Sequence, residues 1–318
     1  MARRALTLPA ALVLCWFSLA SSVPAVTLTL APSSSSGYRW LNVADQAYEA
    51  AYRTSYTYSQ PTVQVQFTYN PSAAVFGGIL TATNLKPNFA YQLKLSGTPG
   101  TPSNERIGLA GRWWEETWNG VAWASGTNLN HKGDGSSPNQ NDLDYFALRD
   151  VPDPTNTSPT GRLYRFTGYL LFDYFITDDS GGVSLTTQQD SSFHVLYNTL
   201  QGEYTHGPND GPLKSSTFDP DPASPAYDTN YGSTTRTIYG EWERLPMGGV
   251  FLANGSYSAQ LVLTEESFHG SVSQGAGTWA QAMDGTVAFA IVPEPGTMAL
   301  FAAGFAALLC RSRRRRSM

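Results

Sequence analysis

The segment Thr62-Val-Gln-Val-Gln-Phe-Thr-Tyr69 contains the clearest structural pattern in the sequence, because apolar and polar residues alternate along it. Successive side chains of a β-strand point to opposite faces of a sheet, so this period of two predicts a strand with one buried face. Further strand-like runs follow at 79–84, 91–95, 163–177, 183–187, 193–197, 238–245, 250–252, 257–263 and 287–292. We therefore expect an all-β fold, with a brief helix over 44–52.

The composition agrees with strands joined by many turns. Only 14% of the 318 residues are charged, whereas glycine (29), proline (20) and aromatic residues are frequent. Residues 26–292 contain 13 of the 20 basic residues but 24 of the 25 acidic ones, a net charge near -11. Because such a surface repels phosphate backbones, we expect no nucleic-acid partner. The two cysteines, Cys15 and Cys310, lie outside 26–292, so this part is expected to contain no disulfide.

The segment Leu85-Lys-Pro-Asn-Phe-Ala-Tyr91 joins two of the expected strands. Its Leu85, Pro87 and Tyr91 resemble the tyrosine corner of fibronectin-III and immunoglobulin-like domains. The resemblance implies that the Tyr91 hydroxyl bonds to the backbone a few residues upstream and that the fold is a Greek-key β-sandwich. The segment from Asn254 to Leu263 repeats the order of a turn, a tyrosine and an apolar strand. Both one elaborated sandwich and two sandwiches in tandem remain open.

The first 25 residues are typical of a secretory signal peptide. Arg3 and Arg4 precede an apolar stretch from Leu6 to Leu19, and cleavage is expected after Ala20 or Ala25. The stretch is short and contains Pro9, which argues against a permanent membrane anchor. We therefore expect an N-terminal signal helix that directs export.

The last 26 residues have three parts in order. The motif Pro293-Glu294-Pro295 precedes an apolar run from Thr297 to Cys310, which is expected to form a single transmembrane helix. At ~1.5 Å per residue the run spans roughly 21 Å, less than the ~30 Å hydrocarbon core, which suits a temporary anchor. The arginines that follow are expected to hold the end of the chain in the cytoplasm. These are Arg311, Arg313, Arg314, Arg315 and Arg316.

This order of motif, helix and basic stop resembles the PEP-CTERM sorting domain. The resemblance implies recognition by an exosortase, a membrane protease that cuts near the motif. It also implies that the protein is anchored in the inner membrane before processing and then reaches the cell surface or the extracellular space. Proteins with this tail are typically made by bacteria that secrete extracellular polysaccharide.

Three tryptophans offer a candidate polysaccharide contact, because tryptophan rings stack on sugar rings. These are Trp113, Trp114 and Trp118, with Trp123 nearby. The alternative is that large aromatic side chains fill the core. Trp113 and Trp114 are adjacent in an expected strand, so at most one of them is predicted to point into the core.

Glu241 and Glu243 flank Trp242 in another expected strand, which would place both carboxylates on one face. Glycosidases use two carboxylates ~5–9 Å apart, so a glycan-active hydrolase is the alternative function. Alternating charged residues are more often the solvated face of a strand, and we expect no enzyme. Glu265 and Glu266 are a weaker pair, because adjacent strand residues point apart.

One histidine and three aspartates lie around a glycine- and asparagine-rich loop: His131, Asp134, Asp142 and Asp144. Because oxygen-rich loops bind calcium in exported proteins, calcium is the only cofactor considered. The spacing of these four residues matches no EF-hand, so a solvated loop without a cofactor is favoured.

The sequence therefore divides into a signal peptide (1–25), a linker with a short helix (26–60), a β-sandwich with loops (61–160), a second sandwich or a continuation of the first (161–292), and the sorting tail (293–318). We expect an exported surface or matrix protein with a structural or binding role, in which a polysaccharide is a candidate partner.

Overall fold

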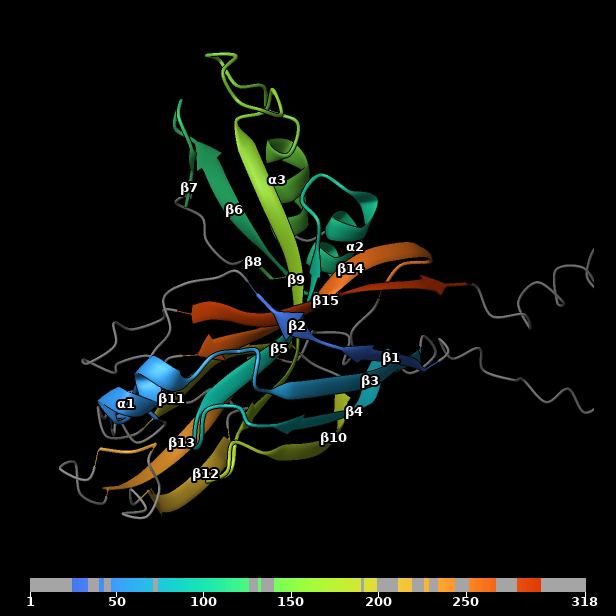
Figure 1. Ribbon diagram of the computed structural model, residues 1–318. Helices are drawn as coiled ribbons and strands as arrows, with labels where there is room; N and C mark the ends of the chain where they lie inside the picture. The colour runs from blue at the N-terminus through green and yellow to red at the C-terminus, as the bar shows by residue number, and fades with distance from the viewer. Residues whose placement is uncertain are drawn as a thin grey trace, which may run out of the picture. The chain divides into compact units, whose positions relative to one another are not determined.

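The computed structural model describes residues 25–33, 40–42, 47–70, 74–125, 131–132, 140–189, 192–198, 211–218, 226–228, 234–243, 252–266 and 279–292. Most regular structure in these residues is β-strand, and the strands form three antiparallel sheets (Figure 1). The expected all-β fold is confirmed. The signal peptide apart from Ala25, and the tail from Pro293 onward, lie outside the described residues.

The four-stranded sheet includes the segment in which apolar and polar residues alternate, and this segment forms β3 (Thr62–Asn70). The strands of the sheet, in spatial order, are β1 (Val26–Thr29), β3, β4 (Val75–Thr83) and β10 (Val183–Gln189). In β3 the apolar residues Val63, Val65, Phe67 and Tyr69 are all buried, and their neighbours in the sequence are not. The alternation therefore predicted this strand and its buried face correctly.

The largest sheet has eight strands among the described residues. Seven follow the order β2 (Ala31–Pro32), β15 (Trp279–Ile291), β14 (Gly255–Glu266), β5 (Ala90–Gly97), β9 (Tyr164–Ile176), β6 (Arg112–Trp118) and β7 (Trp123–Ser125). The eighth, β8 (His131–Lys132), pairs with β6.

These two sheets pack face to face through aromatic side chains. The Phe67 ring of β3 lies 6.2 Å from the Phe172 ring of β9 and 5.8 Å from the Phe289 ring of β15. Phe76 of β4 also contacts Phe172, at 5.3 Å. The buried faces of both sheets thus form one sandwich-like core, as expected from the alternating strands.

A third, three-stranded sheet has the order β11 (Ser192–Asn198), β13 (Thr234–Glu243) and β12 (Gly211–Phe218). Strand β12 lies within 206–231, a stretch rich in proline, aspartate and serine that is typical of a loop. Its Lys-Ser-Ser-Thr segment has no alternation of apolar residues, and pairing with β13 makes it a strand.

Three helices are present in the described residues: α1 (Ala50–Ser55), α2 (Pro102–Ala110) and α3 (Gln140–Leu148). The expected helix at 44–52 begins later in the chain, and α2 and α3 were not predicted. The Thr101 side chain caps α2 by accepting a hydrogen bond from the Asn104 amide at 3.2 Å, and Pro102 occupies the first turn. This pattern is a recognised start signal for a helix, so the sequence contained evidence for α2.

Helix α2 rests directly on the large sheet because two glycines permit a close approach. A Cβ atom at Gly97 of β5 or at Gly168 of β9 would overlap the backbone of Asn104. The Asn104 side chain accepts a hydrogen bond from the Gly168 amide. Any larger residue at either glycine would push the helix off the sheet.

Strands from both halves of the body share the large sheet. Strand β5, from 61–160, lies between β9 and β14, which both come from 161–292. Residues 22–292 form one compact unit. In the part of the chain that the structure describes, no helix is long and apolar enough to cross a membrane.

Candidate functional site

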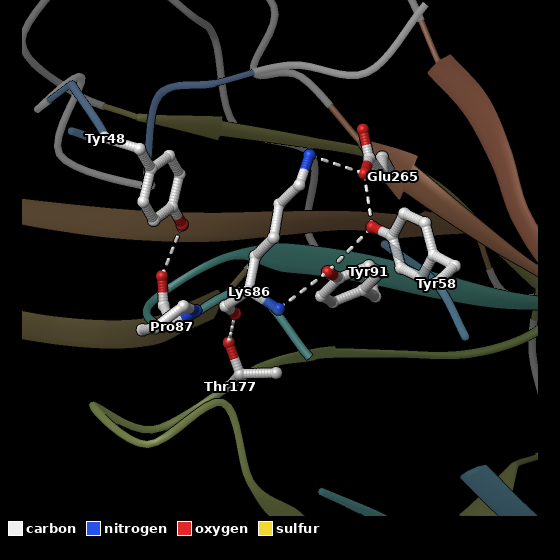
Figure 2. Close-up of polar contacts among 7 residues, drawn as sticks. All are labelled: Tyr48, Tyr58, Lys86, Pro87, Tyr91, Thr177 and Glu265. Carbon is white, nitrogen blue, oxygen red and sulfur yellow. Dashed lines mark hydrogen bonds and ion pairs between the residues drawn. The ribbon is translucent and has the colours of Figure 1, made fainter. Parts of the chain in front are cut away.

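The most unusual chemistry in the described residues is a buried ion pair between Lys86 and Glu265. Lys86 lies in the connection between β4 and β5, and Glu265 lies near the end of β14. The pairing of β14 with β5 places Glu265 opposite Tyr91. Lys86 Nζ is 2.7 Å from Glu265 Oε1, and both side chains are 0% exposed (Figure 2).

Aromatic rings surround the ammonium group of Lys86. Its Nζ atom lies 4.0 Å from the centre of the Trp40 ring, 4.9 Å from Phe89 and 5.9 Å from Tyr58. Aromatic faces attract a cation, but they do not replace the water that it loses. Removing a charged pair from water costs several kcal/mol for each ion, so this arrangement is expensive to build.

A chain of hydroxyl groups ends on the same carboxylate (Figure 2). The Tyr58 hydroxyl donates to Glu265 Oε1, and its oxygen lies 3.0 Å from the Tyr91 hydroxyl oxygen. Because a phenol has a single proton to donate, Tyr91 must donate to Tyr58. Tyr91 in turn accepts a hydrogen bond from the Lys86 backbone amide at 3.2 Å.

These hydroxyl groups remain protonated over a wide pH range. Burial raises the pKa of Tyr58 well above its ordinary value, and the nearby Tyr91 and Glu265 add to the effect. Burial likewise raises the pKa of Tyr91, with smaller contributions from Tyr56 and Glu265. Tyr58 therefore remains a hydrogen-bond donor to Glu265, and Tyr91 remains a donor to Tyr58.

The backbone around Lys86 is fixed from several sides. The Thr177 hydroxyl donates to the Lys86 carbonyl oxygen at 2.5 Å, and the Tyr48 hydroxyl donates to the Pro87 carbonyl oxygen at 2.5 Å (Figure 2). The Leu85 amide donates to the Gly181 carbonyl oxygen at 3.0 Å. The lysine is thus held in place by its main chain as well as by its side chain.

Tyr91 makes the backbone contact that the tyrosine-corner resemblance implied, since its hydroxyl accepts from the amide five residues upstream. Tyr257 makes an equivalent contact by donating to the Ala253 carbonyl oxygen at 2.6 Å, four residues upstream. The two strands that follow these tyrosines, β5 and β14, are neighbours in the sheet. The repeated sequence pattern therefore corresponds to two similar corners.

The predicted tryptophans do not form one surface row. Trp113 is fully buried and packs against Tyr145 of α3 and Phe166 of β9, with ring centres 5.6 and 5.2 Å away. Trp113 therefore belongs to the core and exposes no face to a sugar. Trp118 is half-buried and meets Trp123 edge to face at 5.3 Å. Trp114 lies in β6, and its side chain is outside the described part.

The predicted carboxylate pair lies in the three-stranded sheet, where Glu241 is opposite Val195 and Glu243 is opposite Ser192. The side chains of both glutamates lie outside the described part. The same holds for His131 in β8 and for Asp142 and Asp144 in α3, whereas Asp134 is outside the described residues altogether. No group of three or more metal-binding side chains occurs among the residues that the structure describes.

The Lys86–Glu265 pair was missed by the sequence analysis, which noted Glu265 only as part of a weak carboxylate pair. One signal was available: Glu265 continues the apolar run Leu261-Val-Leu263, where a charged side chain is unexpected. No signal along the chain pairs it with Lys86, which is 179 residues away.

The described fold is that of an all-β, sandwich-like protein with a buried polar cluster in its core. Residues 292–315 match the family model of the PEP-CTERM protein-sorting motif. The chain thus carries the sorting signal of an exosortase-targeted, exported protein that is anchored in a membrane before processing. The predicted motif residues Pro293, Glu294 and Pro295, and the arginines from Arg311 to Arg315, fall within this match. A comparison with curated proteins and with solved structures finds no match.

Proposed function

We propose that this protein is a structural component of the cell surface or the extracellular matrix, delivered there by exosortase processing. The sorting motif at 292–315 is the observation that carries this proposal. Such a motif gives the body a route out of the cell and a temporary anchor, so its function is exerted outside the inner membrane.

The construction of the body supports a structural role. The residues from 26 to 292 include no cysteine, so no disulfide can protect the fold after export. Stability instead depends on a large aromatic core between two sheets and on the hydrogen bonds that hold the backbone around Lys86. A passive, durable scaffold needs these features, and they require no bound cofactor.

Among the described side chains, Trp118 and Trp123 are the candidate contacts for a polysaccharide partner. Their half-buried rings meet on neighbouring strands, and the Arg165 guanidinium lies 5.0 Å from the Trp123 ring. Trp113 cannot contribute, because it is buried. We propose no hydrolytic activity for Glu241 and Glu243, since no observation favours catalysis by them over a solvated strand face.

Processing of the tail is the decisive test. We expect protein recovered from the surface or matrix of the native host to lack the arginine run from Arg311 to Arg316, as measured by intact-mass spectrometry. A variant with alanine at Pro293, Glu294 and Pro295 is the control, and it should keep the arginines and stay with the membrane fraction. Surface-located wild-type protein that still ends at Met318 would refute exosortase processing.

A further inference from the structure

We propose that Lys86 and Glu265 become covalently joined by an amide bond between Lys86 Nζ and Glu265 Cδ. The product is an intramolecular isopeptide cross-link inside the folded body. This inference rests on the geometry of the pair and is independent of the function proposed above.

The reacting groups are already in position. Lys86 Nζ lies 2.7 Å from Glu265 Oε1, and the carbon that it must attack is bonded directly to that oxygen. The amine is therefore within a short movement of the ~3–3.5 Å separation of near-attack geometries. The bonds from Thr177, Tyr48 and the Gly181 carbonyl to the segment around Lys86 prevent the lysine from drifting away.

The environment favours the amide over two separate ions. Both side chains are fully buried, and aromatic rings lie around the ammonium group. A neutral amide has no charge to desolvate, so its formation removes the cost of burying two ions. The same burial restricts the access of water that would hydrolyse the product.

The chemistry is a condensation that balances without an oxidant or a cofactor. A proton passes from the ammonium group to the carboxylate, which leaves a neutral amine and a carboxylic acid. The amine nitrogen then attacks Cδ, the C–N bond forms, and one oxygen leaves as water with a proton from the nitrogen. No electrons are gained or lost, and one water molecule is the only by-product.

Tyr58 is placed to assist the attack. Its hydroxyl donates to Oε1, the oxygen on which negative charge develops when nitrogen adds to Cδ. A donor already aimed at such an oxygen stabilises the tetrahedral intermediate. Tyr91 supports this donor by donating to the Tyr58 oxygen, so the hydroxyl chain keeps Tyr58 oriented. Oε2 is then the oxygen that carries the proton taken from the ammonium group, and it departs as water after a second proton passes to it from the nitrogen.

Holding the two groups together accelerates the condensation, because well-oriented intramolecular reactions reach effective molarities of ~10⁵–10⁸ M. The link would close a covalent loop between residues 179 apart and would tie the β4–β5 connection to β14. It would serve a cysteine-free exported protein in the way that a disulfide serves others.

Mass spectrometry of the purified protein tests the proposal directly. With both chain ends determined, we expect the denatured wild-type protein to be lighter than its sequence by one water molecule. A digest should contain one branched peptide that joins Lys86 to Glu265. Wild-type protein at its full sequence mass, or a loss of water without this branched peptide, would overturn the proposal.

Two lysine variants locate the link. Lys86→Met should have its full sequence mass, whereas Lys94→Met, at a half-buried lysine in β5, should keep the deficit of one water. The wild-type result stands even if Lys86→Met fails to fold. If Lys86→Met were still lighter than its sequence by one water molecule, the assignment of the link to Lys86 would be wrong.

A third variant tests the role of Tyr58 while keeping both reacting groups. Tyr58→Phe should slow cross-linking by about 10²-fold, the usual effect of removing one oxyanion donor. The measurement is the branched fraction in newly synthesised protein followed over time. An unchanged rate would remove Tyr58 from the mechanism, although the link itself would still be decided by the wild-type mass.

Discussion

Tyr91 connects the corner before β5 with the buried ion pair. Its ring is fully buried and stacks on Phe175 at 5.7 Å, while its hydroxyl accepts from the Lys86 amide and donates to Tyr58. One phenol oxygen therefore satisfies a buried main-chain donor and orients the hydroxyl that contacts Glu265. The corner and the candidate site depend on the same atom.

Tyr91→Phe is expected to lower the free energy of unfolding by about 1–3 kcal/mol, because the Lys86 amide is left buried without its acceptor. The ring contacts are retained, so the loss reports on the hydroxyl alone. Chemical denaturation measures this loss, provided that the free energy of unfolding falls with denaturant concentration at the same slope in variant and wild type. Tyr164→Phe, at a half-buried tyrosine of β9, is the control and should change stability little. Equal midpoints for Tyr91→Phe and wild type would exclude a structural role for this hydroxyl.

The turn between β9 and β10 positions the segment that precedes Lys86. Asp178 Oδ1 accepts from the backbone amides of Ser180 and Gly182 at 2.8 and 2.7 Å, which closes this turn. Gly181 has a φ of +76°, and a Cβ atom there would overlap the Leu85 carbonyl oxygen. The turn can therefore approach Leu85 only with glycine at this position.

Gly181→Ala should destabilise the protein by about 2–4 kcal/mol, because a left-handed conformation and a clash with backbone act together. Gly161→Ala is the matched control: its φ is +69°, but nothing lies within 4 Å of the added carbon. Its cost should be limited to about 1–2 kcal/mol for the conformation alone. Thermal or denaturant unfolding would compare the two, and equal losses would show that the approach to Leu85 is not constrained.

The body as a whole is organised around interleaved strands. Strand β5 pairs with β9 on one side and β14 on the other, and Phe67 of the four-stranded sheet packs on rings from β9 and β15. Neither 61–160 nor 161–292 alone contains all the strands of the four-stranded sheet or of the eight-stranded sheet. The four-stranded and eight-stranded sheets therefore depend on each other for their buried faces.

Residues 22–292 are expected to unfold in one cooperative transition, because they form one compact unit with a shared core. Calorimetry should give equal calorimetric and van't Hoff enthalpies. Phe67→Ala, which removes a ring between the two sheets, should shift this whole transition by about 3–5 kcal/mol rather than split it. Two separate transitions in the wild-type protein would instead indicate two domains that fold independently.

Local patterns in the sequence were enough to predict most strands and the sorting signal. The alternation from Val63 to Tyr69 defines both a strand and its buried face, because the period of a strand is a property of neighbouring residues. The motif at 293–295 with its apolar run and arginines is likewise contiguous, and the family match over 292–315 confirms it. The capping signal at Thr101 was equally local, and α2 was missed only because the signal was not used.

The tertiary structure alone decided what the core contains. Trp113 is buried because α3 covers its face of the sheet, and Lys86 meets Glu265 because β14 pairs with β5. Those partners are far apart in the sequence, and no periodicity relates them. The chain by itself therefore determined most of its strands, its corner and its sorting signal. The ion pair and its hydroxyl chain arise only because sheet pairing brings distant segments together in the interior, where both charged side chains are fully buried.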